Sequence, residues 1–248
     1  PSGSFKDRGA AVMMAVAKEH GVTGVVEDSS GNAGASVSAY AARHGIQAHI
    51  FAPASAPEAK LRQIRAYGAE VHAIEGSRDD TTRAAVAFYR ERGLVYASHA
   101  WSPYFVDGAK TFAYEVAAQL DGRAPDHLVF PVGNGGLLLG AWRGFRELGK
   151  DGHVSRVPRL HAVQSSGVMP LVAGYRGEDC SQTSAKSILA GGITVSAPVH
   201  GHCEPRFQAV RDVFEKNIKE GLDLGAAVAF TLDGEPVVDL WGGHLEFD

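Results

Sequence analysis

Residues 22–34 read Val22-Thr23-Gly24-Val25-Val26-Glu27-Asp28-Ser29-Ser30-Gly31-Asn32-Ala33-Gly34. The first six form a short, mostly apolar run, which is typical of a buried strand. The next seven are small, polar or glycine, which predicts a tight turn, and an apolar-periodic segment to about His44 predicts a helix. A strand, a turn and a helix in direct succession indicate an α/β architecture.

The same alternation continues toward the C-terminus. Strands are expected at residues 48–52, 70–74, 94–98, 128–132 and 160–164, and helices at 57–67, 80–92, about 108–120 and from the turn after 132 to about 148. Helices of this length between strands imply right-handed crossovers and parallel pairing. The sequence therefore predicts an α/β fold with open parallel sheets and helices on both faces.

The chain begins, before the segment quoted above, with Pro1-Ser2-Gly3-Ser4-Phe5-Lys6-Asp7-Arg8-Gly9. Ser4 and Asp7 have the spacing of a capping box, so we expect a helix that starts here and runs to about His20. Lys6 would lie in its first turn, where the helix dipole and Arg8 disfavour an ammonium and Asp7 favours it. If the first two dominate, Lys6 loses its proton readily, as a Schiff-base lysine must. An ordinary exposed lysine is the alternative that the residues alone leave open.

Two strand-to-helix turns are rich in glycine and polar residues. They are Ser29–Gly34 and Gly133-Asn134-Gly135-Gly136. Backbone amides at such turns, together with a helix N-terminus, bind carboxylates or phosphates. Neither turn fits a dinucleotide or nucleotide-triphosphate motif. Each could also be a tight turn without a ligand.

Together, the lysine stretch and both turns resemble the fold-type II pyridoxal-phosphate enzymes, and most closely the threonine synthases and their threonine dehydratase relatives. The order and rough spacing of the three motifs are similar to that family. The segments Trp142-Arg143-Gly144-Phe145, His161-Ala162-Val163-Gln164-Ser165 and residues 188–193 are also similar to it. The resemblance covers residues 1 to about 198.

The resemblance implies a pyridoxal 5'-phosphate cofactor and a role for each motif. Lys6 would hold the cofactor and move protons as the catalytic lysine. The substrate carboxylate would bind at Ser29, Ser30, Gly31 and Asn32, and Asn32 would also contact the cofactor ring hydroxyl. The cofactor phosphate would bind at Gly133, Asn134, Gly135, Gly136 and Leu137. The implied reaction converts O-phosphohomoserine to threonine and phosphate, and β-elimination from serine or threonine is the alternative.

From residue 199 the character changes. The pattern predicts a helix at about 204–219 and a hairpin of residues 226–232 and 236–241 around Asp233-Gly234. This tail resembles the opening of serine β-lactamase-like esterases, but the chain has no S-x-x-K nucleophile motif. We therefore expect a truncated or fused chain, with an inactive fragment of a serine hydrolase fusion as another alternative. The expected domains are 1–125 with the lysine and substrate turn, 126–198 with the phosphate turn, and 199–248.

Composition limits the remaining function classes. The 248 residues include 24 basic and 28 acidic side chains, a net charge of −4, which makes nucleic acid and anionic membranes poor partners. The two cysteines, Cys180 and Cys203, favour a cytoplasmic protein without a disulfide framework. His200, His202 and Cys203 are nearly contiguous and lack a second ligand pair, so they predict a polar junction loop and no metal site. The expected partner is a small amino-acid substrate, and a homodimer stays open.

Overall fold

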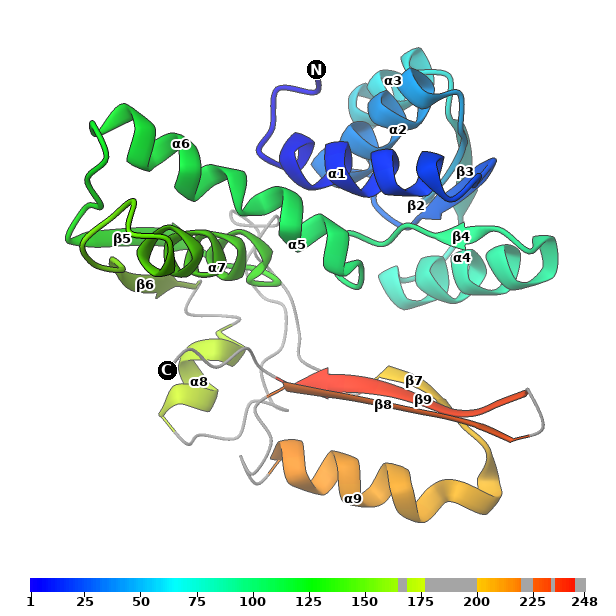
Figure 1. Cartoon of the computed structure of the whole chain (residues 1–248). Coiled ribbons are helices and arrows are strands. Elements are labelled where there is room, and N and C mark those ends of the chain that lie inside the picture. The colour runs from blue at the N-terminus through cyan, green and yellow to red at the C-terminus, as the bar shows by residue number, and fades with distance from the viewer. Residues whose placement is uncertain (165–168, 177–199, 220–224, 233–234, 244–248) are drawn as a thin grey trace. The chain divides into compact units, whose positions relative to one another are not determined.

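The structure, a computed structural model, describes residues 1–164, 169–176, 200–219, 225–232 and 235–243 (Figure 1). The chain forms two compact units. Unit 1 comprises Pro1–Pro125 and Leu139–Pro158, and unit 2 comprises Asp126–Leu138 and the described residues from Arg159 onward. Cys180, residues 188–193 and the Asp233-Gly234 turn lie outside the described residues.

The centre of unit 1 is a four-stranded parallel sheet with the order β3-β2-β1-β4. Its strands are β1 (Gly24–Glu27), β2 (Gln47–Pro53), β3 (Glu70–Ile74) and β4 (Val95–Tyr96). β1, which is buried along its whole length, occupies a central position. The predicted α/β fold with parallel strands is confirmed.

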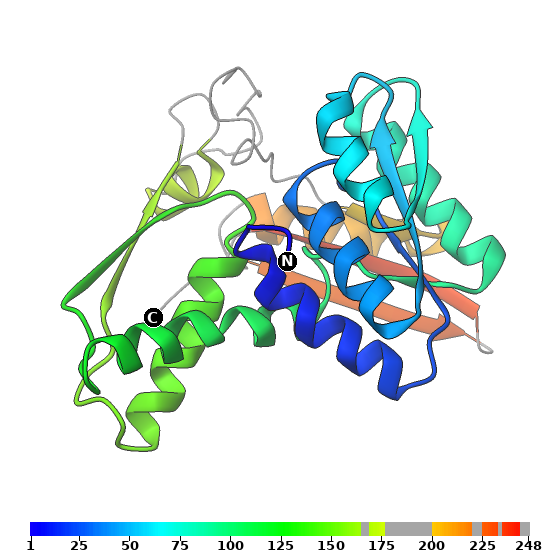
Figure 2. The ribbon, with the colours of Figure 1, turned by 90° about the horizontal axis from the view of Figure 1, so that it is seen from above.

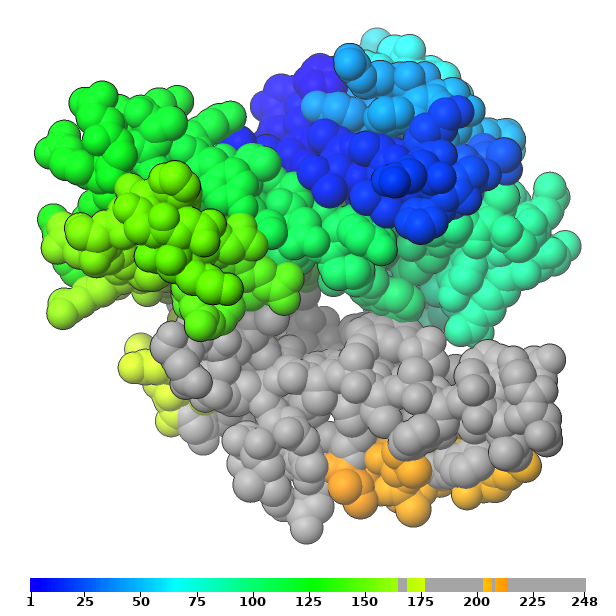
Figure 3. Space-filling model, viewed as in Figure 1, coloured from blue at the N-terminus to red at the C-terminus, as the bar shows by residue number. Residues whose placement is uncertain are grey.

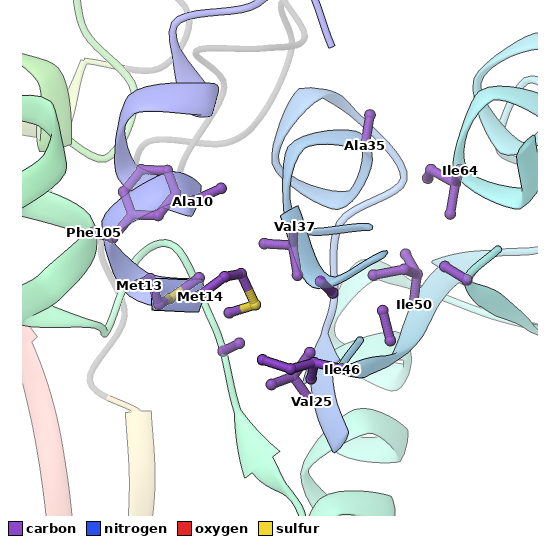
Figure 4. Packing of buried hydrophobic residues seen from close by; sticks show 14 of the residues in the cluster. Ala10, Met13, Met14, Val25, Ala35, Val37, Ile46, Ile50, Ile64 and Phe105 are labelled. Carbon is purple, nitrogen blue, oxygen red and sulfur yellow. The ribbon is translucent and has the colours of Figure 1, made fainter. Parts of the chain in front are cut away.

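Helices cover both faces of this sheet (Figures 1 and 2). One face packs against the helices α1 (Lys6–Glu19), α2 (Asn32–His44) and α3 (Glu58–Ala66), and the other packs against α4 (Arg78–Arg92). The strands contribute side chains to the hydrophobic cores on both faces, because neighbouring residues of a strand point to opposite faces. Val25 belongs to the core of the first face and Val26 to that of the second. Figure 4 shows Met14 of α1 beside Val25 and Val37 in the first core.

The segment that follows β4 differs from the expected single helix of 108–120. It forms α5 (Pro103–Ala109) and α6 (Thr111–Gln119). The first helix starts earlier than expected because Pro103 occupies its first turn, where proline's fixed φ suits a helix and its missing N–H is not needed. Gly108 is required in α5, since a Cβ there would lie 2.1 Å from the carbonyl oxygen of Arg8 in α1.

The helix α7 (Gly136–Lys150) begins in unit 2, and its part from Leu139 onward, which belongs to unit 1, packs closely on α5 and α6. A Cβ at Gly140 would lie 2.6 Å from the Cβ of Ala109, and one at Gly144 would lie 2.7 Å from the carbonyl oxygen of Lys110. The Lys110 ammonium also donates to Glu147 Oε1 at 2.7 Å. The glycines of the predicted helix thus serve helix packing.

Unit 2 contains the parallel pair β5 (His127–Pro131) and β6 (Arg159–Val163) and the short helix α8 (Pro170–Tyr175). It also contains a three-stranded antiparallel sheet, with β9 (Glu235–Gly243) between β7 (His200–Cys203) and β8 (Gly225–Leu232). The predicted hairpin is confirmed, and the predicted helix begins as a 3-10 turn, Pro205–Phe207, before α9 (Gln208–Lys219). The expected junction loop at His200–Cys203 was wrong. This segment is a strand, because its residues pair antiparallel with residues 238–241 of β9, on the edge of β9 that β8 does not occupy.

Candidate active site

The segment before α1 is held in place by hydrogen bonds that differ from the predicted capping box. Ser4 Oγ accepts from the backbone N–H of Lys6 at 3.1 Å, but the Asp7 carboxylate does not return to Ser4. It accepts instead from Ser2, through the backbone N–H at 2.9 Å and the hydroxyl at 2.6 Å. Ser2 Oγ also lies 2.9 Å from Ser36 Oγ of α2. The predicted box was wrong in its partner, because Asp7 binds Ser2, and Ser2 in turn contacts Ser36 of α2. Figure 3 shows α1 (dark blue) against α2 (light blue).

Lys6 lies in the first turn of α1, as expected, and is its first residue, with Phe5 as the N-cap; its side chain is half-buried. Burial lowers the pKa of Lys6, and the negative charge of Glu27 opposes that shift. The Nζ atom lies 5.0 Å from the centroid of the Phe5 ring and 5.6 Å from that of Phe105, so two aromatic rings lie beside the amine. The lowered pKa agrees in direction with the expectation for a reactive lysine.

The cause of this shift differs from the one that the sequence suggested. Arg8 does not act on Lys6 as an isolated charge, because its guanidinium donates to Thr111 Oγ1 at 2.9 Å and pairs with Glu115. Asp7 is engaged with Ser2. Burial and Glu27 are therefore the causes that act on the pKa of Lys6, and neither of them is visible in the nine-residue motif.

Glu27 is the residue that the sequence interpretation missed. It is the last residue of β1 and has no solvent exposure. Its carboxylate accepts from the backbone N–H of His99 at 3.0 Å through Oε2, and its Oε1 lies 3.1 Å from His99 Nδ1. Because strand residues alternate, Glu27 shares the face of Val25, which packs against α1. A charged residue at the end of an otherwise apolar strand was the available signal.

The Ser29–Gly34 turn connects β1 to α2. The backbone N–H of Gly31 donates to Ser29 Oγ at 3.3 Å, and α2 has no side-chain cap at Gly31. Gly34 cannot carry a side chain, since a Cβ there would lie 1.9 Å from the carbonyl oxygen of Ser29. Ser29, Ser30 and Gly31 are half-buried and Asn32 is exposed. The turn thus presents hydroxyls, an amide and an uncapped helix N-terminus, which together suit an anion.

Asp28, which lies between β1 and this turn, has a structural role. Its Oδ2 accepts from Thr82 Oγ1 at 2.6 Å and from Arg78 at 3.2 Å, both on α4. Burial and this carboxylate also raise the pKa of Tyr96, so its phenol stays protonated. Asp28 therefore ties the turn to α4 on the face of the sheet opposite α1.

The second turn, Gly133–Gly136, belongs to unit 2 and follows β5. The N–H of Val132 donates to the carbonyl of Val163 at 2.8 Å, which extends the β5–β6 pairing up to the turn. Gly135 has a φ of 76°, a left-handed conformation that favours glycine. Gly135 is buried, Gly133, Gly136 and Leu137 are half-buried, and Asn134 is exposed. The predicted site residues thus fall into two groups, with Lys6 and the 29–32 turn in unit 1 and residues 133–137 in unit 2.

Gln164 supports the second turn from the end of β6. Its Nε2 donates to the carbonyl of Val132 at 3.3 Å. Its Oε1 accepts from the backbone N–H groups of Leu171 at 2.9 Å and Val172 at 3.2 Å, at the start of α8. The family-like segment 161–165 therefore includes a residue that joins the turn's strand to α8.

None of the helices in the described part of the chain combines the length and the apolar character that a bilayer-crossing helix needs.

Known proteins are similar to this chain in sequence and in fold. Residues 1–226 match the family described as pyridoxal-phosphate dependent enzyme. A threonine synthase of Bacillus sp. (strain ULM1) is 39% identical over 192 residues, which are 77% of this chain and 53% of that protein. A threonine synthase of Methanocaldococcus jannaschii is 34% identical over 203 residues, or 81% of this chain and 50% of that protein. The chain thus spans about half the length of the curated relatives that it matches.

Solved structures agree on the fold. The processed form of threonine deaminase isoform 2 from Solanum lycopersicum has a TM-score of 0.68 at 26% identity, with 78% of this chain and 54% of that chain covered. Maize serine racemase has the same TM-score and identity, with 78% and 57% covered. The family match continues beyond residue 198, where the sequence resemblance was expected to end. Because that match includes most of the chain, this protein belongs to the family of pyridoxal-phosphate-dependent enzymes.

Proposed function

We propose that this chain is part of a pyridoxal-phosphate-dependent lyase of the threonine-synthase type. The observation that carries the proposal is the half-buried Lys6 at the start of α1, whose pKa is lowered by burial. The threonine synthases that are 34% and 39% identical over about four fifths of the chain support this reaction type. The net reaction would take O-phosphohomoserine and water to threonine and phosphate.

The residues present fit the cofactor. Gly34 and Gly135 keep the two turns free of side chains where backbone must approach backbone or adopt a positive φ. The amides and glycines of residues 133–137 would hold the cofactor phosphate at the N-terminus of α7. Asn32 would contact the ring hydroxyl, and Lys6 would hold the cofactor through its amine. When bound, the cofactor supplies an electron sink for carbanion chemistry at the substrate's α-carbon.

The protein's own groups would bind the substrate and move its protons. Ser29, Ser30, Gly31 and Asn32 would bind the substrate carboxylate at the uncapped end of α2, where the helix dipole favours an anion. The Lys6 amine would take and return protons at the substrate carbons, because its lowered pKa brings it toward the working pH. The negative charge of Glu27 would limit how far the pKa of Lys6 falls, so in this scheme Glu27 acts on the reaction only through Lys6.

β-Elimination from serine or threonine to a 2-oxo acid is the second candidate. Its specific support is the likeness to threonine deaminase, with a TM-score of 0.68. The 199–248 tail, interpreted as a fragment similar to serine β-lactamase-like esterases, has no chemistry in either scheme, because the chain lacks the S-x-x-K nucleophile. We keep the proposed division into residues 1–125, 126–198 and 199–248, a cytoplasmic location, and a homodimer as predictions.

One assay separates the candidates. The protein is loaded with pyridoxal phosphate and given O-phosphohomoserine or threonine in parallel. Release of phosphate with formation of threonine supports the first candidate, while ammonia and a 2-oxo acid from threonine support the second. Product formation that survives Lys6→Ala would contradict both. Binding of the cofactor is measured separately as a visible absorbance band that Lys6→Ala removes, so a chain that binds without turnover is distinguished from one that does not bind.

A further inference from the structure

A second polar cluster lies on the other face of the four-stranded sheet, between β2 and β3. It consists of His49, Glu70 and His72, and we call it the His-Glu-His cluster. His49 Nδ1 lies 3.1 Å from His72 Nε2 and 3.4 Å from Glu70 Oε2, and His72 Nε2 lies 3.6 Å from Glu70 Oε1. With one ligand atom from each residue, all three atoms lie within 4.8 Å of one another. From these distances and donor types, we propose that the cluster binds a divalent transition-metal ion of the zinc type.

The spacing of the donor atoms suits such an ion. Zinc binds imidazole nitrogen and carboxylate oxygen at about 2.0–2.2 Å, so neighbouring donors of a tetrahedral site are about 3.3–3.5 Å apart. The three donor–donor distances in the cluster, 3.1, 3.4 and 3.6 Å, lie within a few tenths of an ångström of this range. Glu70 is 57% exposed, so its carboxylate can turn either oxygen to the ion, and water can fill the fourth position.

The imidazoles are prepared for this role by their surroundings. The side chain of His49 is only 9% exposed, and burial lowers its pKa, which favours the neutral ring that a metal requires. The ring of His72 stacks on Phe51 with centroids 4.4 Å apart, and the ring of His49 packs at 4.9 Å from that of Phe88 on α4. The rings are therefore held before an ion arrives.

The position of the cluster indicates a structural role for the ion. Among the strands that the structure describes, β3 is an edge strand, with β2 as its only partner. His49 pairs in register with Glu70, and Phe51 pairs with His72, so the ion would join the first residues of β3 to β2. The cluster faces α4, whereas Glu27 and Lys6 lie on the α1 side. The ion would stabilise the edge of the sheet and take no part in the lysine chemistry.

The test titrates the untagged full chain with Zn²⁺ by calorimetry and with Co²⁺ by visible spectroscopy, where tetrahedral coordination gives intense d–d bands. We expect one tight site and a rise in the thermal midpoint by several degrees at saturating Zn²⁺. His72→Gln and Glu70→Gln should each weaken this site at least about tenfold, because even the loss of a residue that only supports a metal ligand has an effect of that size. Glu70 is mostly exposed, so Glu70→Gln tests the site even if His72→Gln does not fold.

The matched control is His161→Gln. It removes one ring of the other close histidine pair among the described residues, in which His127 Nδ1 lies 2.8 Å from His161 Nε2 in unit 2. This variant leaves His49, Glu70 and His72 in place, so the tight site should stay intact. Arg92→Gln should tighten binding, because the Arg92 charge acts on His49 and opposes a cation. Equal Zn²⁺ binding by the wild type and both cluster variants, or no tight site at all, would overturn the proposal. In that case a direct histidine–histidine hydrogen bond accounts for the 3.1 Å distance.

Discussion

The two polar clusters of unit 1 use opposite faces of one sheet and differ in their access to water. On the α1 side, Glu27 is completely buried, accepts a hydrogen bond from the backbone N–H of His99, and acts on the pKa of Lys6. On the α4 side, Glu70 is 57% exposed beside His49 and His72. A closed cluster can shift the pKa of a neighbouring amine, because no water screens its charge. An open cluster can exchange an ion with the solvent. Because neighbouring strand residues point to opposite faces, one sheet can hold a buried carboxylate on one face and a solvent-exposed carboxylate on the other. The buried one can act on a nearby amine, and the exposed one can bind an ion from solution.

The largest effect that separates the two clusters should come from Lys6→Ala. We expect complete loss of the visible absorbance of bound pyridoxal phosphate and loss of turnover, because the variant has no amine to hold the cofactor. Zn²⁺ binding at the His-Glu-His cluster should stay unchanged. Lys18→Ala, at the exposed end of α1, is the matched control and should keep both properties. A cofactor band that persists in Lys6→Ala would contradict the site assignment.

Gly34→Ala should have the next largest effect. The new Cβ would lie 1.9 Å from the carbonyl oxygen of Ser29, so the turn or α2 must move. We expect a loss of about 3 kcal/mol in the free energy of unfolding, the upper end for overpacking, measured by urea denaturation.

Gly31→Ala is the control in the same turn, because the nearest atom to its new Cβ is Ser29 Oγ at 3.9 Å. Its unfolding free energy should change far less. Equal losses in the two variants would mean that the close approach of Gly34 to Ser29 does not determine the shape of the turn.

Glu27→Gln tests whether the closed cluster acts on Lys6 through charge. The amide can keep a hydrogen bond to His99 while it removes the negative charge that raises the pKa of Lys6. The pKa of Lys6 should therefore fall further. The measurement is the pH dependence of trapping of Lys6 by pyridoxal phosphate and borohydride in cofactor-free protein.

The midpoint of that trapping curve should move to lower pH in Glu27→Gln. Glu19→Gln, at the exposed end of α1, is the control and should leave the midpoint in place. A shift to higher pH, or no shift, would refute the role of Glu27.

The smallest expected effect is the pH dependence of stability that Lys6 contributes. Its pKa is lowered in the folded protein relative to 10.5 in the unfolded chain. Below the folded pKa both states carry the proton, and the cost of the buried charge is fully present. Between the two pKa values the unfolded state binds more protons, so stability rises with pH, and above 10.5 the cost is gone.

Lys6→Met removes this dependence. In cofactor-free protein, it should be more stable than the wild type near neutral pH, and the difference should shrink as the pH approaches 10.5. Urea denaturation at a series of pH values measures it. A difference that is independent of pH would show that packing, and not the charge, distinguishes the two side chains.

Much of unit 1 could be predicted from the sequence because its signals are local. The predicted strand at 70–74 is observed as Glu70–Ile74, and the helix predicted to end at about His44 is observed as Asn32–His44. The capping box was wrong because Ser2, two residues before Ser4, competes for the Asp7 carboxylate. The β7 strand was missed because its partner, β9, lies more than thirty residues further along the chain.

The sequence by itself determined the α/β class, the family resemblance and the candidates Lys6, Ser29–Asn32 and Gly133–Leu137, because periodicity, glycine turns and short motifs are written in consecutive residues. Only the tertiary structure decided what surrounds them. It placed the buried Glu27 where its charge acts on Lys6, and it assigned Arg8 to Glu115. It also brought His49 beside Glu70 and His72 through the register of β2 with β3. These contacts join residues about twenty to more than one hundred positions apart, and only parallel pairing and helix packing select which distant residues meet.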